Sequence, residues 1–214
     1  MVTSNISSIF TGTLHTLTQS FLIPVMVVLS IFFIYALINL GILVAEYYKR
    51  RNNGFDFKIF INQILSVKNH NDNDEIIRVI ENGQIPLNHK EVLKTLVLGS
   101  DVSSEFRESI AIKMVEDESI SSAKKLERTD IIAKIAPAVG LMGTLIPLGP
   151  GLTALGAGNI QSLAQHLTIA FDAAVLGMAS AALAFITSKI KRRWYEEDIS
   201  NLETIVDAVL EILK

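Results

Sequence analysis

Three stretches of this 214-residue chain are apolar over the length that a bilayer requires. Residues 22–45, 135–155 and 167–188 together contain a single charged side chain, and a helix needs about 20 apolar residues to cross the hydrocarbon core. Charged residues return at high density in the segments 46–134 and 189–214. This alternation predicts an all-α membrane protein with three transmembrane helices and long helical extensions outside the membrane.

The charged segments show the periodicity of amphipathic helices. Apolar side chains recur every four residues from Val102 to Met114, which predicts a helix that begins near Asp101. Residues 103–134 include no glycine or proline, so this helix can continue into the second apolar stretch. Asn88, with Glu91 three residues later, is typical of the N-cap of another helix.

A further amphipathic pattern runs from Ile199 to Leu213, after the third apolar stretch. Two interpretations of the apolar stripes are open at this point. The stripes pack against one another within one chain, or they form contacts between copies of the chain.

Basic residues flank the apolar stretches on one side only. They follow the first stretch at Lys49–Arg51, precede the second between Lys124 and Lys134, and follow the third at Lys189–Arg193. Cytoplasmic flanks are enriched in Lys and Arg, so we expect an inner (cytoplasmic) membrane protein with its N-terminus outside and its C-terminus in the cytoplasm. The predicted division is an external N-terminal segment (1–21), transmembrane helix 1 (22–45), a cytoplasmic helical domain (46–134), transmembrane helix 2 (135–155), an external loop (156–166), transmembrane helix 3 (167–188) and a cytoplasmic C-terminal helix (189–214).

Composition narrows the function. Half of the residues are hydrophobic and the net charge is −3, so nothing indicates nucleic-acid binding. The chain has no cysteine, and its four histidines are spread apart, so we expect no metal site. The Gly149–Gly151 segment lacks the lysine of a phosphate-binding loop. No catalytic pair or cofactor loop is evident, and we therefore expect neither an enzyme nor a bound cofactor.

Asp172 is the one charged residue between Lys134 and Lys189. A carboxylate at membrane depth is costly and is a candidate functional site for that reason. Asp172 lies about two turns from the external end of its predicted helix, so water can reach it from that side. It belongs to an ion pathway, or it faces a neighbour as a structural anchor.

Small residues mark the predicted helix-packing positions of the second and third spans. Ala173, Gly177 and Ala181 recur every four residues, and such small-residue ridges let helices approach closely in lipid. We expect these ridges to pack the two spans together and also to contact a neighbouring subunit. The predicted packing positions are Gly140, Gly143, Pro147, Gly177 and Ala181.

Thr144 lies one turn before Pro147, and proline leaves a backbone carbonyl without its helical partner. Two roles are open for the Thr144 hydroxyl. It satisfies the backbone near Pro147, or it lines a pore.

Two segments resemble a known family. Residues 136–145, APAVGLMGTL, look like the "AP-x-LGLLGTV" opening of the second span in MotA/TolQ/ExbB proton-channel proteins, and residues 170–177, AFDAAVLG, look like the third-span "AL-x-TTA-x-G" segment of that family. The two motifs occur in the same order and in the same predicted topology. The motif resemblance covers roughly residues 120–195.

The resemblance implies a homopentameric ring in the lipid bilayer around a dimer of a single-span partner similar to ExbD, TolR or MotB. In that family an Asp of the partner carries the proton, and threonines of the second and third spans line its path. Thr144 matches the second-span threonine. The third-span threonine pair falls on Ala173 and Ala174, so both hydroxyls are missing here.

Two functions follow. The first is an ion-channel stator subunit that uses a proton (or sodium) gradient to drive mechanical work on the partner. The second is a non-conducting scaffold of the same architecture that holds a partner protein, and the missing threonine pair favours it.

Overall fold

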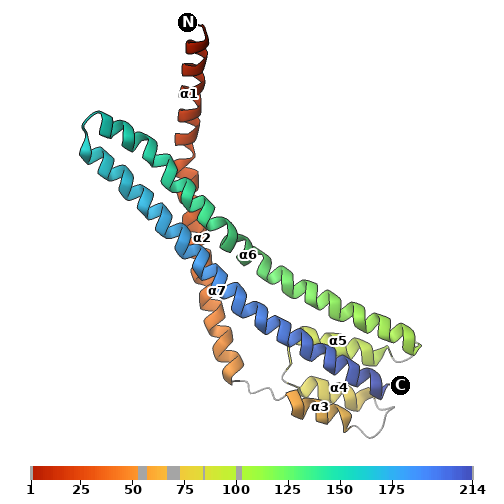
Figure 1. Cartoon of the computed structure of the whole chain (residues 1–214). Helices are drawn as coiled ribbons and strands as arrows, with labels where there is room; N and C mark the ends of the chain where they lie inside the picture. Colours follow the sequence, from red (N-terminus) through yellow and green to blue (C-terminus); the bar gives the residue numbers. More distant parts are fainter. Residues whose placement is uncertain (1, 53–56, 67–72, 84, 100–102, 214) are drawn as a thin grey trace. The chain divides into compact units, whose positions relative to one another are not determined.

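The computed structural model describes residues 2–52, 57–66, 73–83, 85–99 and 103–213. Every regular element in these ranges is an α-helix (Figure 1). Three helical segments, 12–52, Ser104–Gly156 and Ile160–Ile212, are long and apolar enough to cross a membrane. The all-α fold with three membrane-length helices is therefore confirmed. The helices are α1 (Val2–Ser20), α2 (Leu22–Asn52), α3 (Phe57–Leu65), α4 (Asn73–Asn82), α5 (Leu87–Leu98), α6 (Ser104–Gly156) and α7 (Ile160–Ile212).

The chain divides into two compact units, to which α2, α6 and α7 all contribute. The apolar unit comprises residues 1–44 and 128–189. The charged unit comprises residues 45–127 and 190–214.

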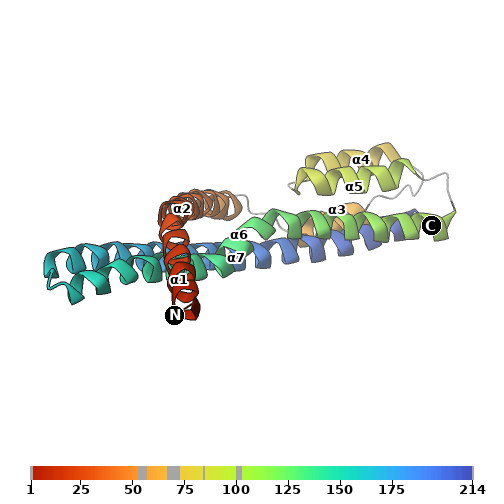
Figure 2. The same ribbon diagram turned by 90° about the horizontal axis from the view of Figure 1, so that it is seen from above.

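In the apolar unit, α6 and α7 form an antiparallel hairpin, and the two helices lie side by side in both ribbon views (Figures 1 and 2). Its turn is much shorter than the predicted loop 156–166, because α7 already begins at Ile160. Gly158 adopts a φ of 76°, a conformation that favours glycine and ends α6. The Asn159 side chain then accepts a hydrogen bond from the Ser162 backbone N–H at 3.0 Å and caps α7.

The break between α1 and α2 has a local cause. Proline removes one backbone N–H, and its ring collides with the carbonyl four residues earlier. Pro24 lies four residues after Ser20, where α1 ends, and it occupies the first turn of α2. Beyond this point, Val25 and Leu29 of α2 pack with Val139, Ile146 and Ala173 of the hairpin.

The charged unit has a core of mainly aliphatic side chains from α3, α4, α5, α6 and α7, together with Phe60. The stripe from Ile199 to Leu213 packs into this core, with Leu202 and Val209 fully buried, so the interpretation of packing within one chain is confirmed for it. The other core members include Ile64, Ile76, Ile80, Leu93, Leu96 and Val97.

Of two local predictions in the charged unit, one is wrong and the other is confirmed in part. Asn88 does not cap α5, because Pro86 holds the N-cap position, and the Asn88 amide donates to Glu118 instead. On α6, which begins at Ser104, the predicted stripe is confirmed in part: Ile110 and Met114 pack against the core, but Phe106 is exposed. The buried positions lie one residue later, at Ala111 and Val115. Asp101 and Val102 lie outside the described residues.

Candidate functional site

The hairpin is held by direct backbone contact between glycines. A Cβ atom on Gly177 would lie 2.8 Å from the Cα of Gly140, and one on Gly143 would lie 2.6 Å from the Cβ of Ala173. Real Cβ atoms essentially never come this close to another heavy atom. Gly177 and Ala173 therefore face α6 of the same chain, as the small-residue ridge predicts for contact between the two spans.

The remaining packing positions are also buried. Ala181 is buried and clusters with Ile132, Ala136 and Ala184. Pro147 is fully buried. Ala174 is half-buried, whereas Ala173, the other position of the missing threonine pair, is 0 % exposed.

A hydrogen bond to the second span comes from α1. Pro150 has no N–H, so the carbonyl oxygen of Ile146, four residues earlier, loses its helical partner. The Gln19 side-chain amide donates to that oxygen at 2.9 Å. Gln19 thus satisfies a backbone group that would otherwise be unpaired in an apolar environment. Sequence reasoning missed this residue, for which the only signal was an amide next to an uncharged apolar stretch.

Thr144 bonds to its own helix. Its hydroxyl donates to the carbonyl oxygen of Leu141 at 2.7 Å. The carbonyl that Pro147 releases is that of Gly143, so Thr144 does not satisfy it. The Thr144 side chain is half-buried.

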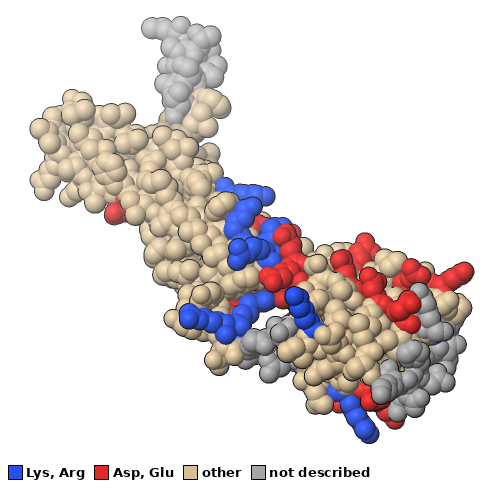
Figure 3. Space-filling view, turned by 60° about the horizontal axis from the view of Figure 1, so that its bottom comes forward, with Lys and Arg blue, Asp and Glu red and all other residues tan. Residues whose placement is uncertain are grey.

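Asp172 lies on the open face of α7, where Phe171, Val175 and Met178 are each at least 60 % exposed. Leu145 on α6 is 59 % exposed as well. Figure 3 shows an isolated acidic side chain on an otherwise neutral surface. Thr144 and Asp172 each adjoin the Gly143–Ala173 contact, so they share one depth in the hairpin but differ in exposure. In a membrane, a single carboxylate on an apolar face requires contact with another protein surface or access to water.

A second polar group of the apolar unit was not predicted. The Ser188 hydroxyl donates to the Asp130 carboxylate across the hairpin. Thr129 and Thr187 are both buried at this end of the helix pair. The sequence did contain a signal: Thr129 lies within the basic flank before the second span, and Thr187 and Ser188 directly precede the basic flank after the third.

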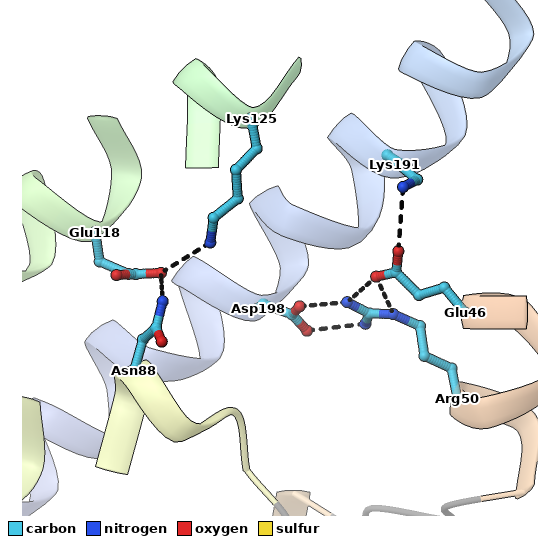
Figure 4. A network of polar contacts seen from close by, with 7 residues as sticks. All are labelled: Glu46, Arg50, Asn88, Glu118, Lys125, Lys191 and Asp198. Atoms are coloured by element: carbon cyan, nitrogen blue, oxygen red, sulfur yellow. Dashed lines mark hydrogen bonds and ion pairs between the residues drawn. The ribbon is translucent and has the colours of Figure 1, made fainter. Parts of the chain in front are cut away.

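The charged unit contains a network of ion pairs (Figure 4). Arg50 contacts Asp198 at 2.5 Å and Glu46 at 3.4 Å, and Lys191 contacts Glu46 at 3.6 Å. The hydrogen bond to Asp198 raises the pKa of Arg50. The Arg50 guanidinium also lies 5.2 Å from the centre of the Trp194 ring, within the range of a cation–π contact.

A polar cavity of about 1160 Å³ adjoins this network. His89 on α5 lines it and is only 5 % exposed, and burial lowers the pKa of its imidazole. Across the cavity wall, Glu118 contacts Lys125 at 3.8 Å and the Asn88 amide at 3.3 Å (Figure 4). Most charges that line the cavity are paired with one another, so the cavity offers no concentrated charge of one sign to a ligand.

No group of three or more His, Asp or Glu side chains suited to a metal ion occurs within the described ranges. The feature that distinguishes the chain is the glycine-packed hairpin of membrane-length helices with one exposed carboxylate. Together with α2, this hairpin defines a multi-pass helical membrane protein.

The sequence matches a family model, described as the MotA/TolQ/ExbB proton channel family, over residues 64–204. This match covers more than half of the chain, and the chain belongs to that family. A comparison with curated proteins gave no match. The family is one of channel and transport proteins, and this membership supports a general proton-channel role for the chain.

Proposed function

We propose that this chain is the ring-forming stator subunit of an ion-driven membrane complex. In this proposal five copies surround a dimer of a single-span ExbD/TolR/MotB-like partner in the inner membrane. Protons, or sodium ions, move past Asp172 and Thr144, and their flow drives movement of the partner. One charge that crosses a potential of 100 mV releases about 2.3 kcal/mol, enough to bias a two-state contact between ring and partner.

The observation that carries this proposal is the position of Asp172. Its carboxylate lies on the open face of the hairpin among large apolar side chains. Contact of this face with lipid would leave the charge unsolvated, whereas contact with a neighbouring subunit or partner supplies water or a counter-charge. The exposed face of α7 that carries Asp172 would thus lie at a subunit interface or along an ion route in an assembly.

The test is ion flux through the complex with a candidate partner in proteoliposomes, read with a pH-sensitive or a sodium-sensitive dye. Asp172→Asn keeps the shape and removes the titratable proton, so we expect loss of flux with normal assembly. Thr168→Val, one turn away on an exposed position of α7, is the matched control and should conduct normally. Loss of assembly in Asp172→Asn would instead make Asp172 a structural anchor.

The alternative is a non-conducting scaffold that holds a partner protein. Two observations favour it: Ala173 and Ala174 carry no hydroxyl, and the Thr144 hydroxyl is bonded to its own helix. A scaffold predicts that the assembled wild-type complex passes neither ion while it still binds the partner.

The proposed topology has residues 1–21 and the α6–α7 turn outside the membrane and residues 46–134 and 189–214 in the cytoplasm. The chain has no cysteine, so single cysteines are specific labels. Ala157→Cys in the turn and Ser119→Cys on α6 are both exposed positions and should react with an impermeant thiol reagent from opposite faces. Reaction from one face would overturn this topology.

A further inference from the structure

The buried residues between α6 and α7 are mostly apolar, but hydroxyl residues join them near the charged flanks. Along α7 the interface positions recur every three or four residues, and along α6 they do the same. The α7 stripe includes Ala173, Gly177, Ser180, Ala184 and Thr187, and the α6 stripe includes Thr129, Ile132, Ala136, Val139 and Gly143. Near the charged flanks, each stripe includes a threonine, Thr187 on α7 and Thr129 on α6.

Thr187 is the unusual member. It is 1 % exposed, and its hydroxyl has no hydrogen-bond partner among the described residues. Ser180 on the same stripe is 0 % exposed, but its hydroxyl donates to the Leu176 carbonyl oxygen of its own helix at 2.6 Å. Buried hydroxyls are nearly always hydrogen-bonded, and a bound water or ion is one established explanation of an exception.

A carboxylate lies at the same depth as Thr187. The hairpin register pairs Gly177 with Gly140 and Ser188 with Asp130, so Thr187 lies level with Asp130. The Ser188 hydroxyl, itself 3 % exposed, donates to the Asp130 carboxylate. Hydroxyl and carboxylate oxygens are the ligands that water, hydrated protons and hard cations prefer.

We propose that Thr187, Ser188 and Asp130 form a cation-binding site at the charged-flank end of the hairpin. The site holds a hydrated proton or a sodium ion through oxygen ligands as the ion passes between the hairpin and the cytoplasm. The inference rests on the proposed conducting function. The proposed site is a second binding position on the ion route. It is separated from Asp172 by about four turns of α7, since residues 172 and 187 are fifteen positions apart.

The experiment uses the full complex with its partner in proteoliposomes. Thr187→Val removes the hydroxyl at nearly constant shape, and Thr187→Ser restores it. Ser180→Ala is the matched control, because it removes a buried hydroxyl from the same stripe. We expect Thr187→Val to lower the ion flux by about tenfold, as for loss of one hydrogen bond to an ion, with Thr187→Ser and Ser180→Ala near wild type.

A second readout does not depend on flux. Infrared difference spectra of the wild-type complex, recorded across a change of pH or of sodium concentration, should show a carboxylate band that Asp130→Asn removes and Thr187→Val shifts. A response to sodium at fixed pH identifies sodium, and a response to pH alone identifies the proton.

The outcomes separate the two proposals. Normal flux in Thr187→Val and Asp130→Asn, with a conducting wild type, overturns the site and leaves the proposed function intact. A wild-type complex that does not conduct overturns the proposed function, and the infrared arm then decides whether the site binds a cation. A carboxylate band that responds to neither pH nor sodium overturns the site.

Discussion

The two units of this chain are packed by residues of different size. The hairpin of the apolar unit brings backbone against backbone at Gly140 and Gly177, with alanines around them. The charged unit instead buries large aliphatic side chains such as Ile64, Leu93 and Leu202. In water, burial of apolar area drives packing, whereas lipid is as apolar as leucine and only close contact is rewarded. The small residues of the hairpin interface therefore suit packing in lipid, and the large aliphatic residues of the other core suit packing in water.

Truncation of a large core residue should be costly only in the charged unit. Leu93 is 0 % exposed, and Leu93→Ala should lower the free energy of unfolding of this unit by about 2–5 kcal/mol through lost burial and a cavity. The measurement is urea unfolding followed by the fluorescence of Trp194, the single tryptophan of the chain, which belongs to the same unit. Leu98→Ala, at a 68 % exposed position of the same helix, is the control. An equal loss in both variants would contradict the assigned core.

Enlargement of a small residue should be costly in the hairpin. Gly177→Leu places a side chain where a Cβ alone would be 2.8 Å from the Cα of Gly140. We expect destabilisation of about 1–3 kcal/mol or more from overpacking, seen as loss of assembly in native mass measurements. Gly41→Leu on α2 is the matched control, because a Cβ there meets nothing within 4 Å. Normal assembly of Gly177→Leu would refute close packing at this position.

How far the sequence predicts the structure also differs between the units. Hydropathy and the glycine and alanine spacing predicted the helix pair and the Gly177 face, because in lipid a narrow set of residues permits close contact. In the charged unit the stripe on α6 was predicted only in part, since Ile110 and Met114 pack against the core while Phe106 is exposed. Arg107 is buried on this helix and donates to the Leu213 carbonyl oxygen at 2.8 Å. A hydropathy pattern places arginine on the surface, so it could not predict that this position is buried.

The site was less accessible to prediction. Asp172 stood out as a charge in an apolar run, but its exposure on α7 could not be read from the sequence. Gln19 was missed because its hydrogen-bond acceptor is brought near only by the tertiary structure. Thr187 was missed because the burial of its hydroxyl without a partner among the described residues is also a property of the tertiary structure. Ile146 lies 127 residues from Gln19, and no local pattern in the sequence links them.

The hydrogen bond of Gln19 offers a milder way to perturb the apolar unit. Gln19→Leu leaves the Ile146 carbonyl oxygen, already without a helical donor because of Pro150, unpaired. Side-chain hydrogen bonds in membranes contribute about 0.6 kcal/mol on average and up to about 1.7, so we expect a small loss of thermal stability in detergent. Gln19→Leu in a Pro150→Ala background should lose less, since the alanine N–H supplies the missing donor. Equal losses in the two backgrounds would show that Gln19 acts by another contact.

A final prediction concerns His89 and the response of the charged unit to acid. Burial lowers the pKa of His89 below its ordinary value of about 6.5, while the nearby carboxylates of Asp198 and Glu118 act in the opposite direction. Between the folded and the unfolded pKa the unfolded chain binds more protons, so stability falls as the pH drops below about 6.5 and levels off below the folded pKa.

Replacement of His89 should remove this part of the acid sensitivity. His89→Gln keeps a polar side chain that does not titrate, so its unfolding midpoint, read from Trp194 fluorescence, should change less than that of the wild type between neutral and mildly acidic pH. His15→Gln, at an exposed position on α1, should follow the wild-type curve. If the His89→Gln and wild-type curves stay parallel through this window, the acid response of the charged unit comes from groups other than His89.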